Sequence, residues 1–378
     1  MHLSGGRMWL LAVRRGTGGV SPARCLSDYV YRMRMLDYYS QNDTAVTNEF
    51  PRSRFVVMLD RKSLVRMEDG DTRLVQLPYG DLRNRLSEWG FEPTMGNSVF
   101  LDLLPSDKTT MEGIAEYEGL FGTSLKTVAL PEDSPVSIDR IRDEIGASFG
   151  GRFIDLRRAM LTMTDEAERN RLAKLQTLSR WSSLYRRCPK CASALRMRAS
   201  KTAAECAPCR RYYYPTFSPV SITLVRNASD THALLVRHRG SVAGVYTCVA
   251  GFALTGESLA DCARREIAEE VGIEAHSVHS LGTSQPWPMP DSSLMVAHEA
   301  IADMDQPLQI CPDELETAHW FSRSEIRASF ERTKVDPTLK GLSRVPEERN
   351  HFKYIPPSGA IAHRIIEQWL NRGPSPIA

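Results

Sequence analysis

One short segment of the chain carries three glutamates at a spacing that could bind metal ions. Glu266, Glu269 and Glu270 are three and four residues apart, so a helix would place their carboxylates side by side. Like charges at that spacing repel one another, and partial burial makes the repulsion more costly. Mg²⁺ and Mn²⁺ prefer oxygen ligands and bridge readily to phosphates, so bound cations would relieve the repulsion. The spacing therefore indicates metal-assisted chemistry on a phosphate substrate.

The expected reaction is attack by water on a diphosphate. Bound cations would neutralise the anionic substrate, stabilise charge in the transition state and make a bound water more nucleophilic. A spare glutamate could accept the proton of that water. The plainer alternative is a solvated acidic face on an ordinary amphipathic helix, which is the usual meaning of a glutamate-rich helix.

The residues around the glutamates predict the helix that must position them. Ser258 is a suitable N-cap and Gly272 is a suitable C-terminal stop. Arg265 can pair with Glu269 or Glu257 and offset part of the negative charge. Apolar residues between the two ends recur at every fourth position and form a stripe that we expect to be buried: Leu259, Ala263, Ile267 and Val271.

Four cysteines form a second candidate metal site. They are two C-x2-C pairs with fourteen residues between them: Cys188, Cys191, Cys206 and Cys209. Two such pairs can place four thiolates around Zn²⁺, and four protein ligands leave no open position for catalysis. We therefore expect a structural zinc ribbon rather than disulfides, because the chain carries no secretory signal. The scattered Cys25, Cys248, Cys262 and Cys311 are expected to be small buried apolar residues.

The composition is that of a globular protein without a strong charge bias. The chain has 378 residues, 42% of them hydrophobic, and a formal net charge of +2 at pH 7. Its length predicts two or three domains, and its charge indicates neither general attraction to nucleic acid nor an acidic tail. Apolar runs fall short of the roughly 18 residues that a membrane helix needs, so we expect no membrane partner.

The N-terminal segment differs from the rest of the chain. Residues 1–27 contain four arginines and no acidic residue, with an apolar patch at Met8–Val13. Arg-rich, acid-poor and amphipathic segments are typical of mitochondrial transit peptides. We therefore expect mitochondrial localisation, in the matrix, with cleavage between Arg24 and Ser27. A basic N-terminus without a targeting role is the alternative.

Strand-like and helix-like segments alternate after the cysteine pairs. The strand-like segments are Val220–Val225, Ala233–Val236, Tyr246–Ala250, Ser293–Ala297 and Ala318–Phe321, and an amphipathic helix is expected at Ala360–Leu370. This order predicts an α/β (α+β) fold in which helices flank a mixed sheet. The polar segment Glu331–Arg349 is expected to be a loop.

The region before the cysteine pairs has mixed character. Strands are expected at Phe55–Leu59 and Ser98–Leu104, and helices at Phe153–Leu161 and Asp165–Leu184. We therefore expect four parts. They are a transit peptide at 1–27, an α+β N-terminal domain at 28–183, a zinc ribbon at 184–214 and a catalytic domain at 215–378.

A proline-rich segment, Ser284–Ser292, follows the acidic helix. Its three prolines fix the backbone and remove hydrogen-bond donors, so we expect neither a helix nor a central strand. Trp287 would then lie on a rigid loop that could line a pocket for a planar ring. The alternative is a rigid connector in which Trp287 fills the core.

Two motifs resemble known families. Gly251–Ile273 matches the Nudix box, G-x5-E-x7-R-E-U-x-E-E-x-G-U with U apolar, at every fixed position, which makes the solvated-face alternative a minor one. Ser284–Ser292 resembles the S-Q-P-W-P-F-P-x-S of the NADH pyrophosphatase branch of Nudix hydrolases. The cysteine ribbon, Tyr214–Pro215 and Pro356–Ala362 resemble the same branch over roughly residues 150–372. The basic N-terminus and Leu315–Ser322 are most similar to the animal mitochondrial NAD(P)H pyrophosphatases.

The resemblance implies a Nudix α/β/α sandwich acting as an NAD(P)H diphosphatase. It would hydrolyse NADH, and also NADPH, to reduced nicotinamide mononucleotide and AMP or its 2'-phosphate. The implied Mg²⁺ or Mn²⁺ ligands are Glu266, Glu270, Glu314 and the Ala250 carbonyl, while Glu269 would be a further ligand or the proton acceptor and Arg265 a catalytic neighbour. The implied substrate contacts are Tyr214, Phe252 (stacked on the nicotinamide), Gln285, Pro286, Trp287, Pro288, Met289, Pro290, Asp291, Ser292 and Ala362. The resemblance also implies a homodimer whose pocket the partner chain completes.

Three positions depart from the pattern of this branch. Thr216 replaces an arginine after Tyr-Pro, Met289 replaces an aromatic residue, and Ala192 replaces a glycine after the first cysteine pair. The first two bear on substrate preference and leave the hydrolytic centre unchanged.

Two other functions stay open. One is decapping of NAD-capped RNA, for which the near-neutral charge gives little support. The other is a catalytically inactive Nudix protein that binds a dinucleotide or a partner, against which the three intact glutamates argue.

Overall fold

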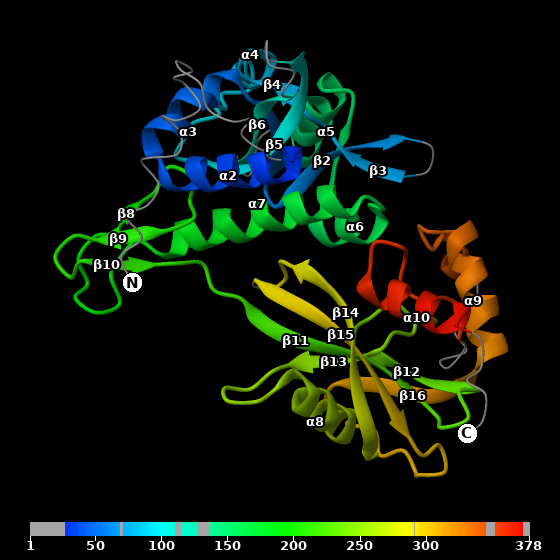
Figure 1. Cartoon of the computed structure of the whole chain (residues 1–378). Coiled ribbons are helices and arrows are strands. Elements are labelled where there is room, and N and C mark those ends of the chain that lie inside the picture. Colours follow the sequence, from blue (N-terminus) through cyan, green and yellow to red (C-terminus); the bar gives the residue numbers. More distant parts are fainter. Residues whose placement is uncertain are drawn as a thin grey trace, which may run out of the picture. The chain divides into compact units, whose positions relative to one another are not determined.

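The computed structural model describes residues 27–68, 71–109, 115–127, 137–290, 292–344 and 352–372 (Figure 1). Residues 1–26 of the predicted transit peptide lie outside the described residues. The chain divides into two compact units. Unit 1 is Met1–Asp60, Gln76–Val128 and Leu178–Pro215, and unit 2 is Arg61–Val75, Ala129–Thr177 and Thr216–Ala378. The four predicted domain ranges remain a prediction.

Unit 1 contains strands, helices and the two cysteine pairs. Its elements are α2 (Asp28–Gln41), α3 (Asp43–Glu49), η1 (Phe50–Arg52), β1 (Arg54–Leu59), β4 (Leu77–Pro78), α4 (Tyr79–Ser87), β5 (Ser98–Thr109), β6 (Ala115–Leu125), β8 (Arg196–Met197), β9 (Ala204–Cys206) and β10 (Arg211–Tyr213). β6 runs parallel to β1 and antiparallel to β5. The rings of Phe50, Phe55 and Phe121 pack together, with the Phe55 and Phe121 centroids 5.5 Å apart, and form an aromatic core.

Unit 2 contains the acidic helix and most of the remaining elements. They are β2 (Lys62–Glu68), β3 (Asp71–Leu74), α5 (Ile138–Ser148), β7 (Arg152–Asp155), α6 (Leu156–Thr162), β11 (Ser218–Arg226), β12 (His232–His238), β13 (Val249–Phe252), α8 (Leu259–Val271), β14 (Ala275–Trp287), β15 (Ser293–Ala302), β16 (Leu315–Ser322), α9 (Arg323–Val335), η2 (Lys340–Arg344) and α10 (Ile361–Asn371). Helix α7 (Glu166–Leu184) begins in unit 2 and ends in unit 1.

The main sheet of unit 2 is mixed. Its strand order is β14-β15-β11-β12-β16, and β13 pairs with the first half of β11. β11 and β15 are parallel, whereas the other pairs are antiparallel. β13 therefore lies in the sheet immediately before α8 and delivers the chain to the start of that helix.

Alternate residues of the central strands face two separate cores. Leu224 and Leu235 pack against α9 and α10, whereas Val225 and Leu234 pack on the opposite face against α8. Figure 1 shows α8 on one side of the sheet and α9 and α10 on the other. The predicted sandwich of helices around a mixed sheet is confirmed.

Several local predictions were wrong. Trp287 is the last residue of strand β14 and does not lie on a loop. β14 is an edge strand, so one of its sides has no neighbouring strand to bond with. Pro286 is tolerated there although it has no backbone N–H to donate. The segment Phe153–Leu161 begins with β7 before it turns into α6, and β13 starts at Val249 rather than Tyr246.

The predicted loop at Glu331–Arg349 is also partly helical. α9 continues to Val335, because Ile326, Phe330 and Thr333 extend its buried face, and η2 follows at Lys340–Arg344. Residues 345–349 lie outside the described part of the chain.

Candidate active site

Helix α8 has the ends that its sequence predicts. The Ser258 hydroxyl accepts a hydrogen bond from the backbone N–H of Asp261 at 3.2 Å and caps the helix. Gly272 ends it in the left-handed region, with φ +72°, where an added Cβ would come within 2.5 Å of Gln309. Ala263, Ile267 and Val271 of the predicted stripe are fully buried, while Leu259 is half-buried. Both ends of the helix are thus fixed by residues within or next to it.

Three carboxylates from two segments meet beside this helix. Glu266 and Glu270 lie one helical turn apart on its inner side, with only 8% and 2% of their surface exposed. The exposed Glu314, from the segment before β16, completes a cluster in which carboxylate oxygens lie within 4.8 Å of one another. Glu269 is exposed and turns toward Arg265. The structure therefore brings together three of the four predicted acidic residues.

Glu270 is the least satisfied member of the cluster. Its Oε2 is buried and has no hydrogen-bond partner among the described residues. Burial, followed by the charges of Glu266 and Glu314, raises its pKa from 4.5 to about 8, although the backbone N–H of Ala250 donates to the carboxylate. Burial also raises the pKa of Glu266. A divalent cation fits this donor set, because three oxygen ligands and an unpartnered buried oxygen lie together.

Arg265 connects α8 to the loop before it. Its guanidinium donates to both carboxylate oxygens of Glu257, at 2.9 and 3.0 Å, and to Glu266 and Glu269, at 2.8 and 2.7 Å. It also donates to the backbone carbonyl of Phe252 at 2.8 Å. The predicted pairing with Glu269 or Glu257 occurs with both at once. Arg265 therefore joins α8 to Phe252 and Glu257, while Glu270 has no cationic partner among the described residues.

Gly251 shows why this position requires glycine. A Cβ built there would lie 1.9 Å from the carboxyl carbon of Glu266. The strand β13 and the Glu266 side chain could not approach this closely with any other residue.

The predicted substrate contacts on unit 2 have different exposures. Phe252, which follows Gly251 on β13, has 49% of its surface exposed, so its ring is available for stacking. Ala362 is 3% exposed in the first turn of α10, and its methyl group belongs to the core, so only its backbone could face a ligand. Tyr214 belongs to unit 1 and is 60% exposed.

The proline-rich segment is held by backbone and side-chain bonds. Gln285 is buried, and its Nε2 donates to the carbonyl of Gly359 at 2.8 Å. The Ser292 carbonyl accepts from the backbone N–H of Ser218 at 2.8 Å. Among the other predicted contacts, Pro288 is buried, Pro286, Trp287 and Met289 are half-buried, Pro290 is exposed, and Asp291 lies outside the described residues. The Met289–Pro290 peptide bond is cis.

The four ribbon cysteines form a second cluster, in unit 1. Their sulfur atoms lie within 4.8 Å of one another, with Cys191 and Cys206 at 3.5 Å and Cys188 and Cys209 at 4.0 Å. Four thiolates around a zinc ion at about 2.3 Å would be separated by roughly 3.8 Å, so the cluster is compatible with structural zinc. The Tyr213 hydroxyl, 3.1 Å from Cys188 Sγ, lowers the pKa of that thiol to about 6 by hydrogen bonding.

Of the scattered cysteines, Cys248 and Cys262 are buried as expected and Cys311 is half-buried, while Cys25 lies outside the described residues. Among the described helices, none combines the length and apolar character needed to cross a bilayer.

Comparison with known proteins agrees with this geometry. A family model described as the NUDIX domain matches residues 217–342, which include β13, α8 and Glu314. The chain is 54% identical over 343 residues to the NAD-capped RNA hydrolase ndx-9 of Caenorhabditis elegans, covering 91% of this chain and 90% of that protein. The chain belongs to the Nudix hydrolase family.

Two human relatives are more distant. One is the mitochondrial NAD(P)H pyrophosphatase NUDT13, which is 31% identical over 92% of this chain and 93% of that protein. The other is the NAD-capped RNA hydrolase NUDT12, which is 27% identical over 86% of this chain and 68% of that protein. The resemblance inferred from the Nudix box and the proline-rich segment is confirmed.

Some contacts of the predicted site residues were not predictable from the sequence. The bond from Tyr213 to Cys188 and the bond from Gln285 to Gly359 join segments whose proximity the sequence does not reveal. By contrast, the fixed Gly251 of the Nudix box was a usable signal of close packing.

Proposed function

We propose that this Nudix hydrolase cleaves the diphosphate of nicotinamide adenine dinucleotides. The preferred substrate would be NADH, with NADPH also accepted. The products are reduced nicotinamide mononucleotide and AMP, or its 2'-phosphate. The cluster of Glu266, Glu270 and Glu314 carries this proposal, because its unpartnered buried oxygen favours a divalent cation. The names of the relatives support a nicotinamide dinucleotide as the substrate.

Glu266, Glu270 and Glu314, with the Ala250 carbonyl, would hold Mg²⁺ or Mn²⁺. When bound, the cation neutralises the diphosphate and makes water a better nucleophile. The water oxygen bonds to one phosphorus as the bridging P–O bond breaks, and an acidic side chain accepts the proton. Glu269 is suited to that task because it is exposed and not part of the cluster. Arg265 holds the loop and the helix in register.

The substrate would also contact residues outside the carboxylate cluster. Phe252 would stack on the nicotinamide ring, because its exposed ring lies directly after Gly251. Tyr214, the Ala362 backbone and the segment Gln285–Ser292 would contact the rest of the dinucleotide. A homodimer would complete the pocket, and analytical ultracentrifugation of the full chain tests that part of the proposal.

Release of AMP from NADH, with and without Mg²⁺, tests the function directly. Metal-dependent release supports it. Absence of release from NADH, NADPH and NAD at any metal concentration would instead favour an inactive protein that only binds dinucleotides.

The second candidate substrate is NAD-capped RNA. The 54% identity to a protein named as an NAD-capped RNA hydrolase favours it. The bond cleaved would be the same, so the two candidates differ only in what the adenosine carries. Binding of capped RNA that weakens steeply with salt indicates contacts to RNA phosphates, whereas a flat salt dependence indicates that only the cap is bound.

The cysteine ribbon would hold one structural Zn²⁺. Replacing Cys188 or Cys209 with serine should release zinc, measured by elemental analysis, and lower the unfolding temperature. Intact zinc content in both variants would contradict the assignment.

Mitochondrial localisation, in the matrix, is also proposed. It rests on the basic segment 1–27 and on a relative named as mitochondrial. Imaging of the full chain fused to a C-terminal fluorescent protein tests it, with a chain that starts at Asp28 as the control.

A further inference from the structure

Unit 2 has a polar pocket outside the carboxylate cluster. It lies between the start of α7, the end of α9 and the first turns of α10, and its volume is about 390 Å³. Its ionisable lining consists of Glu166, Arg169, Lys334, His363, Arg364 and Glu367. None of these residues belongs to the Nudix box or to the contacts proposed above.

Arg169 is the most informative residue of this pocket. Only 3% of its surface is exposed. Its Nη1 donates to the carbonyls of Met163 and Thr164 at 2.6 and 2.7 Å, while its Nε has no hydrogen-bond partner among the described residues. Both partners are neutral, so no hydrogen-bonded carboxylate offsets the charge. Burial, followed by the charge of Arg364, lowers the pKa of Arg169, although the charges of Glu166, Asp165 and Asp71 act in the opposite direction. A buried cation in this state is stabilised by an anion.

The other charges of the pocket also favour an anion. Lys334 and Arg364 keep 53% and 35% of their side chains exposed, so they can reach a ligand. Among the lining residues, three cations face two carboxylates, Glu367 and Glu166, which pairs with Arg364 at 3.1 Å. Lys334 also lies 3.9 Å from Glu331, outside the lining. Burial lowers the pKa of His363, which favours the neutral form of this ring.

The start of α10 adds to this positive potential. Ala360 occupies the N-cap position without a side-chain cap, and the helix continues for eleven residues. Uncapped backbone N–H groups at a helix start attract anions.

The pocket shares its walls with segments assigned to the substrate. Ser358 lines it, and the next residue, Gly359, accepts the hydrogen bond from Gln285. Arg364 donates to the hydroxyl of Thr283 at 3.0 Å, on the same strand as Gln285. Ala362 directly precedes His363. An anion in this pocket would therefore lie beside a dinucleotide bound to those segments.

We propose that this pocket binds a phosphate group that the substrate carries outside its diphosphate, on the adenosine ribose. The inference rests on the proposed function. Two substrates present such a group: NADPH has a 2'-phosphate, and NAD-capped RNA has a phosphodiester on the 3' oxygen. The recognition chemistry is the same for both.

Calorimetric titration of the full chain tests the pocket. The three probes are AMP, adenosine 2',5'-bisphosphate and adenosine 3',5'-bisphosphate. We expect one bisphosphate to bind about tenfold more tightly than AMP, because its second phosphate gains charge-assisted bonds. Lys334→Gln should remove most of that advantage without changing the affinity for AMP.

Lys62→Gln is the matched control. Lys62 also makes one 3.9 Å ion pair and is similarly exposed, but it does not line the pocket. Arg169→Gln is a second variant, and thermal unfolding checks that it folds.

A preference for the 2' isomer assigns the pocket to NADPH, and a preference for the 3' isomer assigns it to capped RNA. Bisphosphates that bind no better than AMP, or an advantage that survives in both pocket variants, would overturn the proposal. NADH hydrolysis is measured on the same preparation. Failure of that reaction with the bisphosphate advantage intact counts against the proposed function and not against the phosphate pocket.

Discussion

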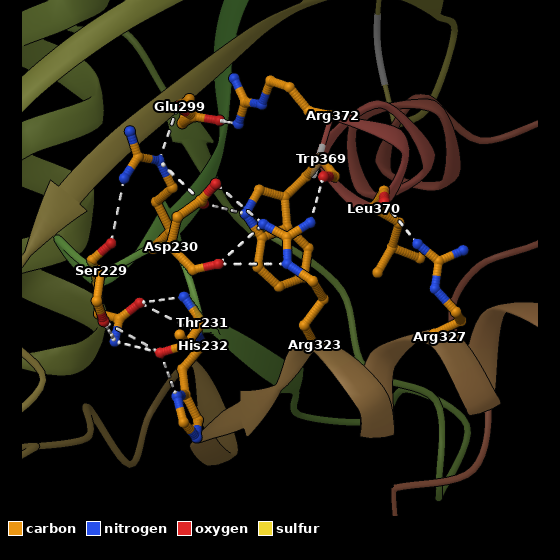
Figure 2. A network of polar contacts seen from close by, with 12 residues as sticks. Ser229, Asp230, Thr231, His232, Glu299, Arg323, Arg327, Trp369, Leu370 and Arg372 are labelled. Carbon is orange, nitrogen blue, oxygen red and sulfur yellow. Dashed lines mark hydrogen bonds and ion pairs between the residues drawn. The ribbon is translucent and has the colours of Figure 1, made fainter. Parts of the chain in front are cut away.

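Unit 2 contains two groups of acidic residues with buried members, and the groups differ in the number of protein cations that pair with them. Asp230 and Glu299 are 1% and 4% exposed, and each has arginine partners. Figure 2 shows Asp230 facing both Arg323 and the indole of Trp369, and Glu299 facing Arg372. Asp230 lies 2.9 Å from Arg323 Nη2 and 2.6 Å from Trp369 Nε1. The arrangement joins the start of α9 to the end of α10, so its role is structural.

In the cluster of Glu266, Glu270 and Glu314, the first two carboxylates are buried like Asp230 and Glu299, whereas Glu314 is exposed. Among the described residues, one arginine pairs with this cluster. Arg265 donates one hydrogen bond to Glu266. It also donates hydrogen bonds to Glu257, Glu269 and a backbone carbonyl. The comparison teaches that acidity and burial alone do not mark a metal site. The informative property is that the buried Glu270 has no cationic partner among the described residues.

The largest effect should come from removing the least satisfied carboxylate. Glu270→Gln should lower the rate of NADH hydrolysis at least about 10³-fold, or roughly 4 kcal/mol, because a metal ligand is lost. Its free energy of unfolding without metal should stay the same or rise, since a costly buried acid is gone. Glu274→Gln, at an exposed position just after α8, is the control and should keep full activity. Full activity in Glu270→Gln would contradict the assignment of the metal site.

Removing Asp230, a buried acid that pairs with protein cations, should lower the stability of the fold rather than the activity. Asp230→Ala should lower the free energy of unfolding by about 3 kcal/mol, because it leaves Arg323 and Trp369 Nε1 without their buried partner. Denaturant titration measures the loss, and Asp305→Ala, at an exposed position, should cost less than about 0.5 kcal/mol. A loss of turnover in Asp230→Ala molecules that remain folded would contradict the distinction between the two groups.

The pH dependence of stability should separate the two groups further. The pKa of Glu270 is raised from 4.5 to about 8, so the metal-free folded state holds a proton that the unfolded chain has released. Its contribution to stability is complete below about pH 4.5 and is lost as the pH rises toward about 8.

Denaturation in EDTA at pH 5 and pH 8 should show this loss, on the order of 3.5 kcal/mol, as a difference between the wild type and Glu270→Gln. Mg²⁺ should restore the wild type at pH 8 and leave the variant unchanged. Equal pH profiles for the two proteins would show that Glu270 is ionised without metal.

The smallest effect on stability should come from Arg372, the exposed partner of Glu299. Arg372 keeps 44% of its side chain exposed, and Glu299 also has Arg226 as a partner at 3.0 Å. Arg372→Gln should therefore cost less than about 1 kcal/mol in denaturant titration. A cost as large as that of Asp230→Ala would mean that the group acts as one cooperative unit.

The parts of the site that the sequence predicted depend on short-range spacing. A cap, a stop and a four-residue apolar repeat determine α8, so the positions of Glu266 and Glu270 follow from local rules. Glu314 reaches the cluster from the segment before β16, and only the family resemblance pointed to it. Local pattern contains no information on which distant segments meet.

The errors have related causes. The prolines around Trp287 suggested a loop, but an edge strand tolerates a proline because no neighbour needs its missing donor. The pocket around Arg169 had no signal in the sequence, since α7, α9 and α10 supply its walls from separate segments. The exposure and direction of each lining side chain depend on how these helices pack. The sequence of one helix does not reveal that packing.

The contacts of Arg265 have a consequence for how the molecule opens. The loop between β13 and α8 is exposed at its surface, yet Arg265 holds Glu257 and the Phe252 carbonyl, and Glu257 in turn accepts from the N–H of Leu254 at 2.9 Å. Arg265 lies in the middle of α8, so these bonds tie the loop to the helix. In hydrogen exchange, the Leu254 amide should therefore show the protection of the helix rather than that of a surface loop.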